Sequence, residues 1–151
     1  MVIIVKMIAR NQPPSSRGWY RPASIAKTEA IMIKRFDRLD VATSDLNDAA
    51  SIYEKNFGFK VTRSGEHASV SVGGAEIRLA SGASAADAIK ANGEGMFALW
   101  LEAEDLDQVV ASLGKAGIAS GAIRKEAGQR ILALDPKLAN QVPLFIFDRK
   151  G

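Results

Sequence analysis

Two arginines and two carboxylates occupy matching positions in two short apolar segments. Arg38 and Asp40 are two residues apart in RLDVAT, and Glu76 and Arg78 are two residues apart in AEIRLA. Because side chains alternate across a β-strand, each pair shares one face of its strand. Two guanidinium groups on one face are suited to hold a carboxylate or a phosphate. The carboxylates are suited to bind a cation or a hydroxyl group, or to transfer protons where burial raises a pKa.

Aromatic residues follow the same alternation later in the chain. Trp100 and Glu102 share one face of ALWLE, and Phe145 lies in PLFIF. Such rings stack on flat apolar groups. The alternative is a structural role, in which the arginines and carboxylates pair across neighbouring strands and the rings fill space or close a dimer interface. The sequence leaves both interpretations open.

The elements that position these residues follow from hydrophobic periodicity. Leu39, Val41 and Thr43 alternate with the residues of the opposite face, which predicts a half-buried strand. Asp45 is predicted to cap a helix whose apolar residues recur every three or four positions. Gly58 is placed to end this helix in a left-handed conformation. Three short strands, FKVTRS, ASVSVGG and EIRLAS, are predicted to follow.

The same order of elements returns in the second half of the chain. Asp105 falls 60 residues after Asp45, and Gly117 falls 59 residues after Gly58. We therefore predict a duplicated β-α-β-β-β unit, with one copy at 34–81 and the other at 96–149. An Ala-, Gly- and Ser-rich linker at 82–95 joins the copies.

Composition excludes several classes of protein. The 151 residues contain no Cys, which excludes disulfides and Cys-bound metals and is compatible with the cytoplasmic location that we predict. The net charge of +3 is spread along the chain, so we predict no nucleic-acid partner. No apolar run reaches the ~20 residues that a membrane helix needs, so we predict no membrane partner. Residues 1–33, rich in Pro, Ser and Arg, are predicted to be a flexible leader, although an Arg-rich, acid-poor start also occurs in transit peptides.

The duplicated order carries a family resemblance. SDLNDAASIYEKNFGFKV in the first copy, and EDLDQVVASLGKAGI with a late DP in the second, resemble the vicinal-oxygen-chelate superfamily. That superfamily includes glyoxalase I, methylmalonyl-CoA epimerase, extradiol dioxygenases and bleomycin resistance proteins. The resemblance implies an α+β fold, in which two paired βαβββ modules at 34–151 form curled mixed sheets around a cleft. Combined with strand alternation, it places seven candidate ligand-binding side chains in the cleft: Arg38, Asp40, Glu76, Arg78, Trp100, Glu102 and Phe145.

The resemblance also identifies four positions that matter for metal binding. Metal enzymes of the superfamily hold their ion with His, Gln or Glu on the first and last strand of each unit. The matching positions here are Arg38, Arg78, Ala98 and Phe145. Arginine repels a divalent cation, and Ala and Phe carry no donor atom. We therefore predict neither a metal nor another cofactor.

Three functions remain open. The first is a metal-free binding protein of the bleomycin-resistance type, a homodimer that sequesters a small, partly charged aromatic ligand. The second is a lyase, isomerase or dioxygenase with an unorthodox metal site built from Asp40, His67, Glu76 or Glu102. The third is a non-catalytic regulatory or interaction module tethered by residues 1–31. His67, the single histidine, is predicted to be exposed in a loop or at a strand end.

Overall fold

A computed structural model describes residues 33–151, and the predicted leader at 1–33 lies outside these residues apart from Ile33. The first module comprises β1 (Ile33–Ala42), α2 (Leu46–Phe57), β2 (Val61–Ser64), β3 (His67–Val72) and β4 (Ala75–Ala80). The second module comprises β5 (Gly95–Ala103), α4 (Leu106–Lys115), β6 (Arg124–Glu126), β7 (Gln129–Ala133) and β8 (Leu144–Asp148). The linker forms η1 (Gly82–Ser84) and α3 (Ala86–Asn92), and η2 (Pro136–Ala139) precedes β8.

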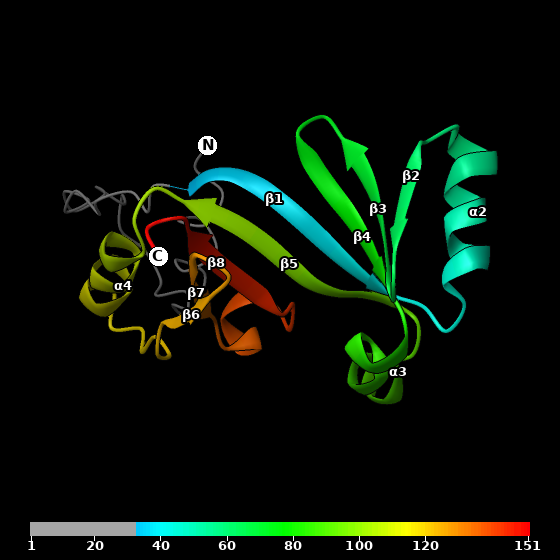
Figure 1. Ribbon diagram of the computed structural model, residues 1–151. Coiled ribbons are helices and arrows are strands. Elements are labelled where there is room, and N and C mark those ends of the chain that lie inside the picture. Colours follow the sequence, from blue (N-terminus) through cyan, green and yellow to red (C-terminus); the bar gives the residue numbers. More distant parts are fainter. Residues whose placement is uncertain (1–32) are drawn as a thin grey trace, which may run out of the picture.

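The described strands form one curled, eight-stranded mixed sheet in the order β2-β3-β4-β1-β5-β8-β7-β6. In each module the first and last strands are parallel neighbours, namely β1 with β4 and β5 with β8. The two modules join through the antiparallel pair β1 and β5, which run side by side through the middle of Figure 1. The predicted α+β fold of two paired βαβββ modules is confirmed.

The predicted helix ends of the first module are formed as expected. Asp45 accepts a hydrogen bond from the backbone N–H of Asp48 at 2.9 Å, which satisfies one of the free donors at the start of α2. Gly58 ends the helix at φ 68°. This left-handed conformation costs an L-residue with a side chain about 1–2 kcal/mol, which explains why glycine is used there.

Each module has its own hydrophobic core between its helix and its half of the sheet. Ala50 of α2 packs against Ala68 and Leu79, and Leu106 and Val109 of α4 belong to the corresponding cluster of the second module. Full burial of one such Leu or Val side chain contributes about 1.5–3 kcal/mol. The cores hold the helices on the outer face of the sheet (Figure 1), so the opposite face is left to form a site.

The linker helix α3 covers part of that opposite face. Ala42 and Ala80 are buried against Ala85, with Ile89 and Phe97 packed around them. Alternation puts Ala42 on the same face of β1 as Asp40, so α3 closes one end of the concave surface on which Asp40 lies.

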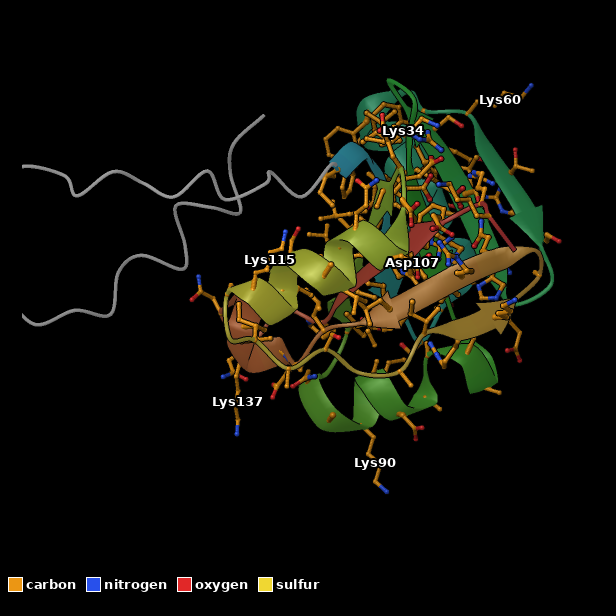
Figure 2. All side chains as sticks on the ribbon, turned by 90° about the vertical axis from the view of Figure 1, so that its left-hand side faces the viewer. Lys34, Lys60, Lys90, Asp107, Lys115 and Lys137 are labelled. Atoms are coloured by element: carbon orange, nitrogen blue, oxygen red, sulfur yellow. The ribbon has the colours of Figure 1, made fainter. Side chains whose placement is uncertain are left out.

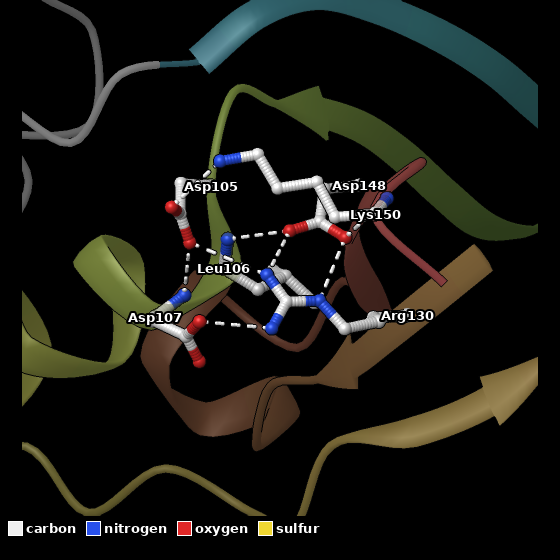
Figure 3. A network of polar contacts seen from close by, with 6 residues as sticks. All are labelled: Asp105, Leu106, Asp107, Arg130, Asp148 and Lys150. Atoms are coloured by element: carbon white, nitrogen blue, oxygen red, sulfur yellow. Dashed lines mark hydrogen bonds and ion pairs between the residues drawn. The ribbon is translucent and has the colours of Figure 1, made fainter.

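A polar network fastens α4 to the last strands of the second module (Figure 3). Asp148 accepts hydrogen bonds from the backbone N–H of Leu106 at 2.8 Å and from Arg130 Nε at 2.9 Å. Burial alone would raise the pKa of Asp148, but these bonds outweigh burial and lower it. Asp105, which caps α4, accepts one hydrogen bond from Lys150 Nζ and another from the backbone N–H of Asp107. Together these two bonds lower the pKa of Asp105 to about 2. The network therefore stabilises the module in its ionised form.

Two features of the described residues bear on the predictions about membrane and nucleic-acid partners. None of the helices within residues 33–151 is long and apolar enough to cross a bilayer. Lys60, Lys90 and Lys137 point outward from separate parts of the molecule (Figure 2). The absence of a nucleic-acid partner stays a prediction.

Candidate functional site

Three charged residues of the predicted cleft meet on the concave face of the sheet. Asp40 of β1 is the register partner of Arg78 on β4, because the two strands are parallel neighbours. Arg78 donates from Nε to Asp40 Oδ1 at 2.9 Å and from Nη2 to Oδ2 at 3.0 Å. This paired geometry is the strongest form of arginine–carboxylate contact. Asp40 is only 2% exposed, so it acts as a buried anchor for the guanidinium group.

Arg38 contacts the same carboxylate less completely. Its Nε lies 3.0 Å from Asp40 Oδ1, yet this buried nitrogen has no partner of hydrogen-bond geometry within residues 33–151. Its guanidinium carbon lies 4.3 Å from the ring centroid of Trp100, a cation–π distance. Burial lowers the pKa of Arg38, the charge of Asp40 opposes this, and the neighbouring charge of Arg78 lowers the pKa further. Arginine nevertheless stays cationic at physiological pH.

The aromatic residues form a wall beside the arginines. Trp100 of β5 donates from Nε1 to Asp40 Oδ2 at 2.7 Å. Its ring stacks on Phe145 of β8, with centroids 4.5 Å apart and an interplanar angle of 14°. Trp100 therefore contacts both the charged residues and Phe145. Because the two rings stack on each other, one face of each ring is already covered and is not open to a ligand.

Two pockets flank this central group. The larger, of about 340 Å³, is the arginine pocket, named for Arg38, Arg78 and Arg124 in its wall. The smaller, of about 230 Å³, is the histidine pocket, named for His67 in its wall. Arg78, Trp100 and Phe145 line both pockets, so the two share a common partition.

The arginine pocket carries excess positive charge. Arg38, Arg78 and Arg124 face Glu126 in its lining, and Asp40 lies behind the first two arginines. The lining itself holds three guanidinium groups and one carboxylate, that of Glu126, while Asp40, Glu76 and Asp37 act on Arg38 from outside the lining. Such a pocket attracts an anion and disfavours a cation.

Two predicted cleft carboxylates, Glu76 and Glu102, lie outside the lining of both pockets. Glu76 accepts a hydrogen bond from Ser69 Oγ at 2.8 Å. Glu102 accepts from Arg35 Nε at 2.6 Å and from Lys34 Nζ at 3.3 Å. These partners neutralise Glu102 at the far end of β5, so it is occupied with structural contacts.

His67 lines a pocket although it was not among the seven residues predicted to lie in the cleft. It begins β3, as a strand-end histidine, but it is half-buried in the wall of the histidine pocket, so the prediction of an exposed residue is wrong. Its Nδ1 is buried and has no hydrogen-bond partner in the described part of the chain. The signal available in the sequence was alternation, which puts His67 on the same face of its strand as Ser69. The structure adds that His67 lies opposite Ala80 of β4.

The four positions that the sequence resemblance matched to metal ligands do not fit a metal ion here. Arg38 and Arg78 direct guanidinium groups at Asp40, and Ala98 and Phe145 carry no donor. The oxygens of Asp40 are already held by Arg78 and Trp100. Within residues 33–151, no three His, Cys, Asp or Glu side chains are grouped so that they could hold a metal. These residues therefore support no metal-dependent step.

Comparison with known proteins identifies the fold. The sequence profile of the Glyoxalase/Bleomycin resistance protein/Dioxygenase superfamily matches residues 35–151. Methylmalonyl-CoA epimerase from Streptomyces coelicolor, solved with 2-nitronate-propionyl-CoA, is 21% identical, with a TM-score of 0.62 over 77% of this chain and 94% of that one. The Mycobacterium tuberculosis methylmalonyl-CoA epimerase is 22% identical, with a TM-score of 0.63 over 78% of this chain and 89% of that one.

A hypothetical protein from Bacillus halodurans C-125 is 17% identical, with a TM-score of 0.66 over 78% of this chain and 95% of that one. Among curated protein sequences, none is significantly similar to this chain. At these identities the solved structures show a shared fold. The match of the superfamily profile to most of the chain confirms the resemblance seen in the sequence. The chain belongs to the glyoxalase/bleomycin resistance protein/dioxygenase superfamily.

Proposed function

We propose that this protein is a metal-free binding protein that holds a small anionic ligand with a flat apolar part in its arginine pocket. The observation that carries the proposal is that two guanidinium groups share one buried carboxylate. Arg38 and Arg78 both contact Asp40, and Arg124 adds a third cation to the same pocket. An anionic ligand would supply a counter-charge on the open side of these arginines, where the lining holds only one carboxylate.

The arginines are oriented before a ligand arrives. Arg78 uses Nε and Nη2 on Asp40, which leaves Nη1 for another acceptor. Trp100 packs against the guanidinium group of Arg38. Groups that are already held in position lose little side-chain entropy on binding, so more of the interaction energy appears as affinity.

The size and walls of the pocket narrow the ligand class. A volume of about 340 Å³ lies at the small end of ligand sites, which favours a single-ring compound. Trp100, Phe145 and Ile131 supply an apolar wall beside the cations. Aromatic carboxylates and aromatic phosphate esters combine these features, whereas cationic antibiotics do not.

Binding of benzoate and phenyl phosphate, measured by isothermal titration calorimetry, tests the proposal, with benzylamine as the cationic counterpart. Loss of one charged hydrogen bond costs about 1.5–3 kcal/mol, so Arg38→Gln should weaken benzoate binding about 10- to 100-fold. Lys90→Gln is the control, because Lys90 is exposed on α3 and lines neither pocket. Benzylamine binding as tightly as benzoate, or an Arg38→Gln variant with unchanged affinity, would contradict the proposal.

Two parts of the proposal have tests of their own. Metal analysis of protein purified without chelator should find no stoichiometric divalent ion, and finding one would favour an enzyme with an unorthodox site. The predicted homodimer can be checked by light scattering. Since β1 and β5 already pair the modules within one chain, the pockets require no second chain, and ligand binding should not depend on protein concentration.

A further inference from the structure

The histidine pocket adjoins the proposed ligand site and has a different chemistry. Its walls are largely apolar and include Phe97, Ala98 and Pro143. Its polar members are mostly engaged: Asp40 is held by Arg78, and the hydroxyl of Ser84 donates to the carbonyl of Ser81 at 2.7 Å. Among the described lining residues, His67 and the outer edge of Arg78 remain for a bound molecule.

The two ring nitrogens of His67 lie in different surroundings. Nδ1 is buried and has no partner within residues 33–151. A proton on Nδ1 would be a buried donor without an acceptor, which is costly, whereas an unpaired lone pair is tolerated more easily. The neutral ring therefore carries its proton on Nε2. Because the ring lines the pocket, Nε2 is the nitrogen that a bound molecule can reach.

We propose that the histidine pocket is a second subsite, which takes an uncharged oxygen acceptor such as a carbonyl group and uses Nε2–H of His67 as the donor. The apolar walls disfavour a second charged group, because burying a charge without a partner is costly. The positive outer edge of Arg78 also favours an acceptor. The two polar groups that remain available, those of His67 and Arg78, thus both favour a ligand that accepts a hydrogen bond.

This inference deepens the proposed function and rests on it for the other half of the ligand. Arg78, Trp100 and Phe145 line both pockets, so one molecule can span the partition between them. Its anion would lie among the arginines, its ring beside Trp100 and Phe145, and its carbonyl against His67. The substrate class is therefore an aromatic acid, or aromatic phosphate ester, that carries a carbonyl group across the ring.

A matched pair of ligands separates the two subsites. Benzoate and 4-acetylbenzoate differ by the acetyl group that the histidine pocket should accept. One neutral hydrogen bond should make 4-acetylbenzoate bind about three- to tenfold more tightly than benzoate. His67→Phe should abolish this preference, whereas Arg124→Gln should weaken both ligands by the same factor and preserve the preference. Thermal unfolding of both variants checks that they fold.

The single histidine allows a direct readout as well. In ¹⁵N-labelled protein the imidazole signals belong to His67 without further assignment. The nitrogen shifts should show the proton on Nε2, and 4-acetylbenzoate should move the Nε2 signal more than benzoate does. Acetophenone, which carries no charge, should move the same signal. The response to acetophenone tests the histidine pocket on its own. If neither acid binds, the anion site proposed in the arginine pocket is refuted, but the acetophenone result still decides the histidine subsite.

Three results would overturn the inference. One is a proton located on Nδ1. Another is equal affinity for the two acids with no Nε2 response to acetophenone, which would mean that the pocket holds water only. The third is a His67→Phe variant that folds normally and keeps the preference for 4-acetylbenzoate.

Discussion

Replacing the shared carboxylate should destabilise the fold and strengthen anion binding at the same time. Asp40 is 2% exposed and accepts hydrogen bonds from Arg78 and Trp100, while Arg38 lies within ion-pair distance. Asp40→Asn keeps the shape of the side chain but removes its charge. The two guanidinium groups then lose the carboxylate that they share, and only one side-chain oxygen remains as an acceptor.

The magnitude follows from these contacts. Hydrogen bonds to a charged group contribute about 1.5–3 kcal/mol each, and breaking one partner of a fully buried ion pair costs about 3–5 kcal/mol. The side chains of Arg38 and Arg78 are 18% and 30% exposed, so water can compensate part of the loss. We expect the free energy of unfolding of Asp40→Asn to fall by about 2–4 kcal/mol.

The effect on ligands has the opposite sign. The remaining side-chain oxygen of Asp40→Asn can still position Arg78, while the positive charge of the arginine pocket rises, so benzoate should bind this variant more tightly than wild type and restore more of its stability. Urea unfolding with and without benzoate measures both quantities. Glu104→Gln is the control, because Glu104 is an exposed carboxylate outside both pockets. A variant as stable as wild type within about 0.5 kcal/mol, or one with weaker benzoate binding, would refute this reasoning.

Two further predictions concern stability. Folding lowers the pKa of Asp105 to about 2 and also lowers the pKa of Asp148, so the folded state favours both ionised forms. The free energy of unfolding should therefore fall as the pH drops from about 4 toward 2. Urea unfolding at several pH values should show a shallower loss in Asp105→Asn, and an unchanged slope would argue against the network around Arg130. Gly58→Ala, at φ +68° with nothing within 4 Å of the added Cβ, should lower the melting temperature by about 4 °C, whereas Gly114→Ala, at an open helical position, should raise it. Shifts of the same sign in calorimetry would contradict the assignment of backbone strain.

Much of the fold was predictable because it follows from local periodicity. The alternation of Leu39 and Val41, the cap at Asp45 and the turn at Gly58 each depend on neighbouring residues alone. The same order of strand, Asp cap and helix recurs at Asp105, 60 residues later, and supports the prediction a second time. Such patterns survive in a single sequence because a strand with one buried face repeats every two residues, and a helix with one buried face repeats about every 3.6.

Partner choice within the site could not be predicted in the same way. The sequence left open whether the arginines and carboxylates pair across neighbouring strands, and it did not say which residues would pair. The parallel register of β1 and β4 sets Arg78 opposite Asp40, and these two form a cross-strand ion pair, while Glu76 takes Ser69 as its donor. A shift of register by one residue would turn every side chain to the other face, so no local pattern determines these contacts.

The sequence by itself determined which residues share the inner face: Arg38 and Asp40 on one strand, Arg78 on another, Trp100 and Phe145 on two more. It also predicted, through the family resemblance, that none of the four positions matched to metal ligands carries a suitable side chain. Only the tertiary structure decided that two arginines share Asp40, that α3 closes one end of the concave face, and that His67 lines a pocket. The physical reason is that faces are set by backbone periodicity within an element, whereas contacts and pockets depend on how distant elements are placed together.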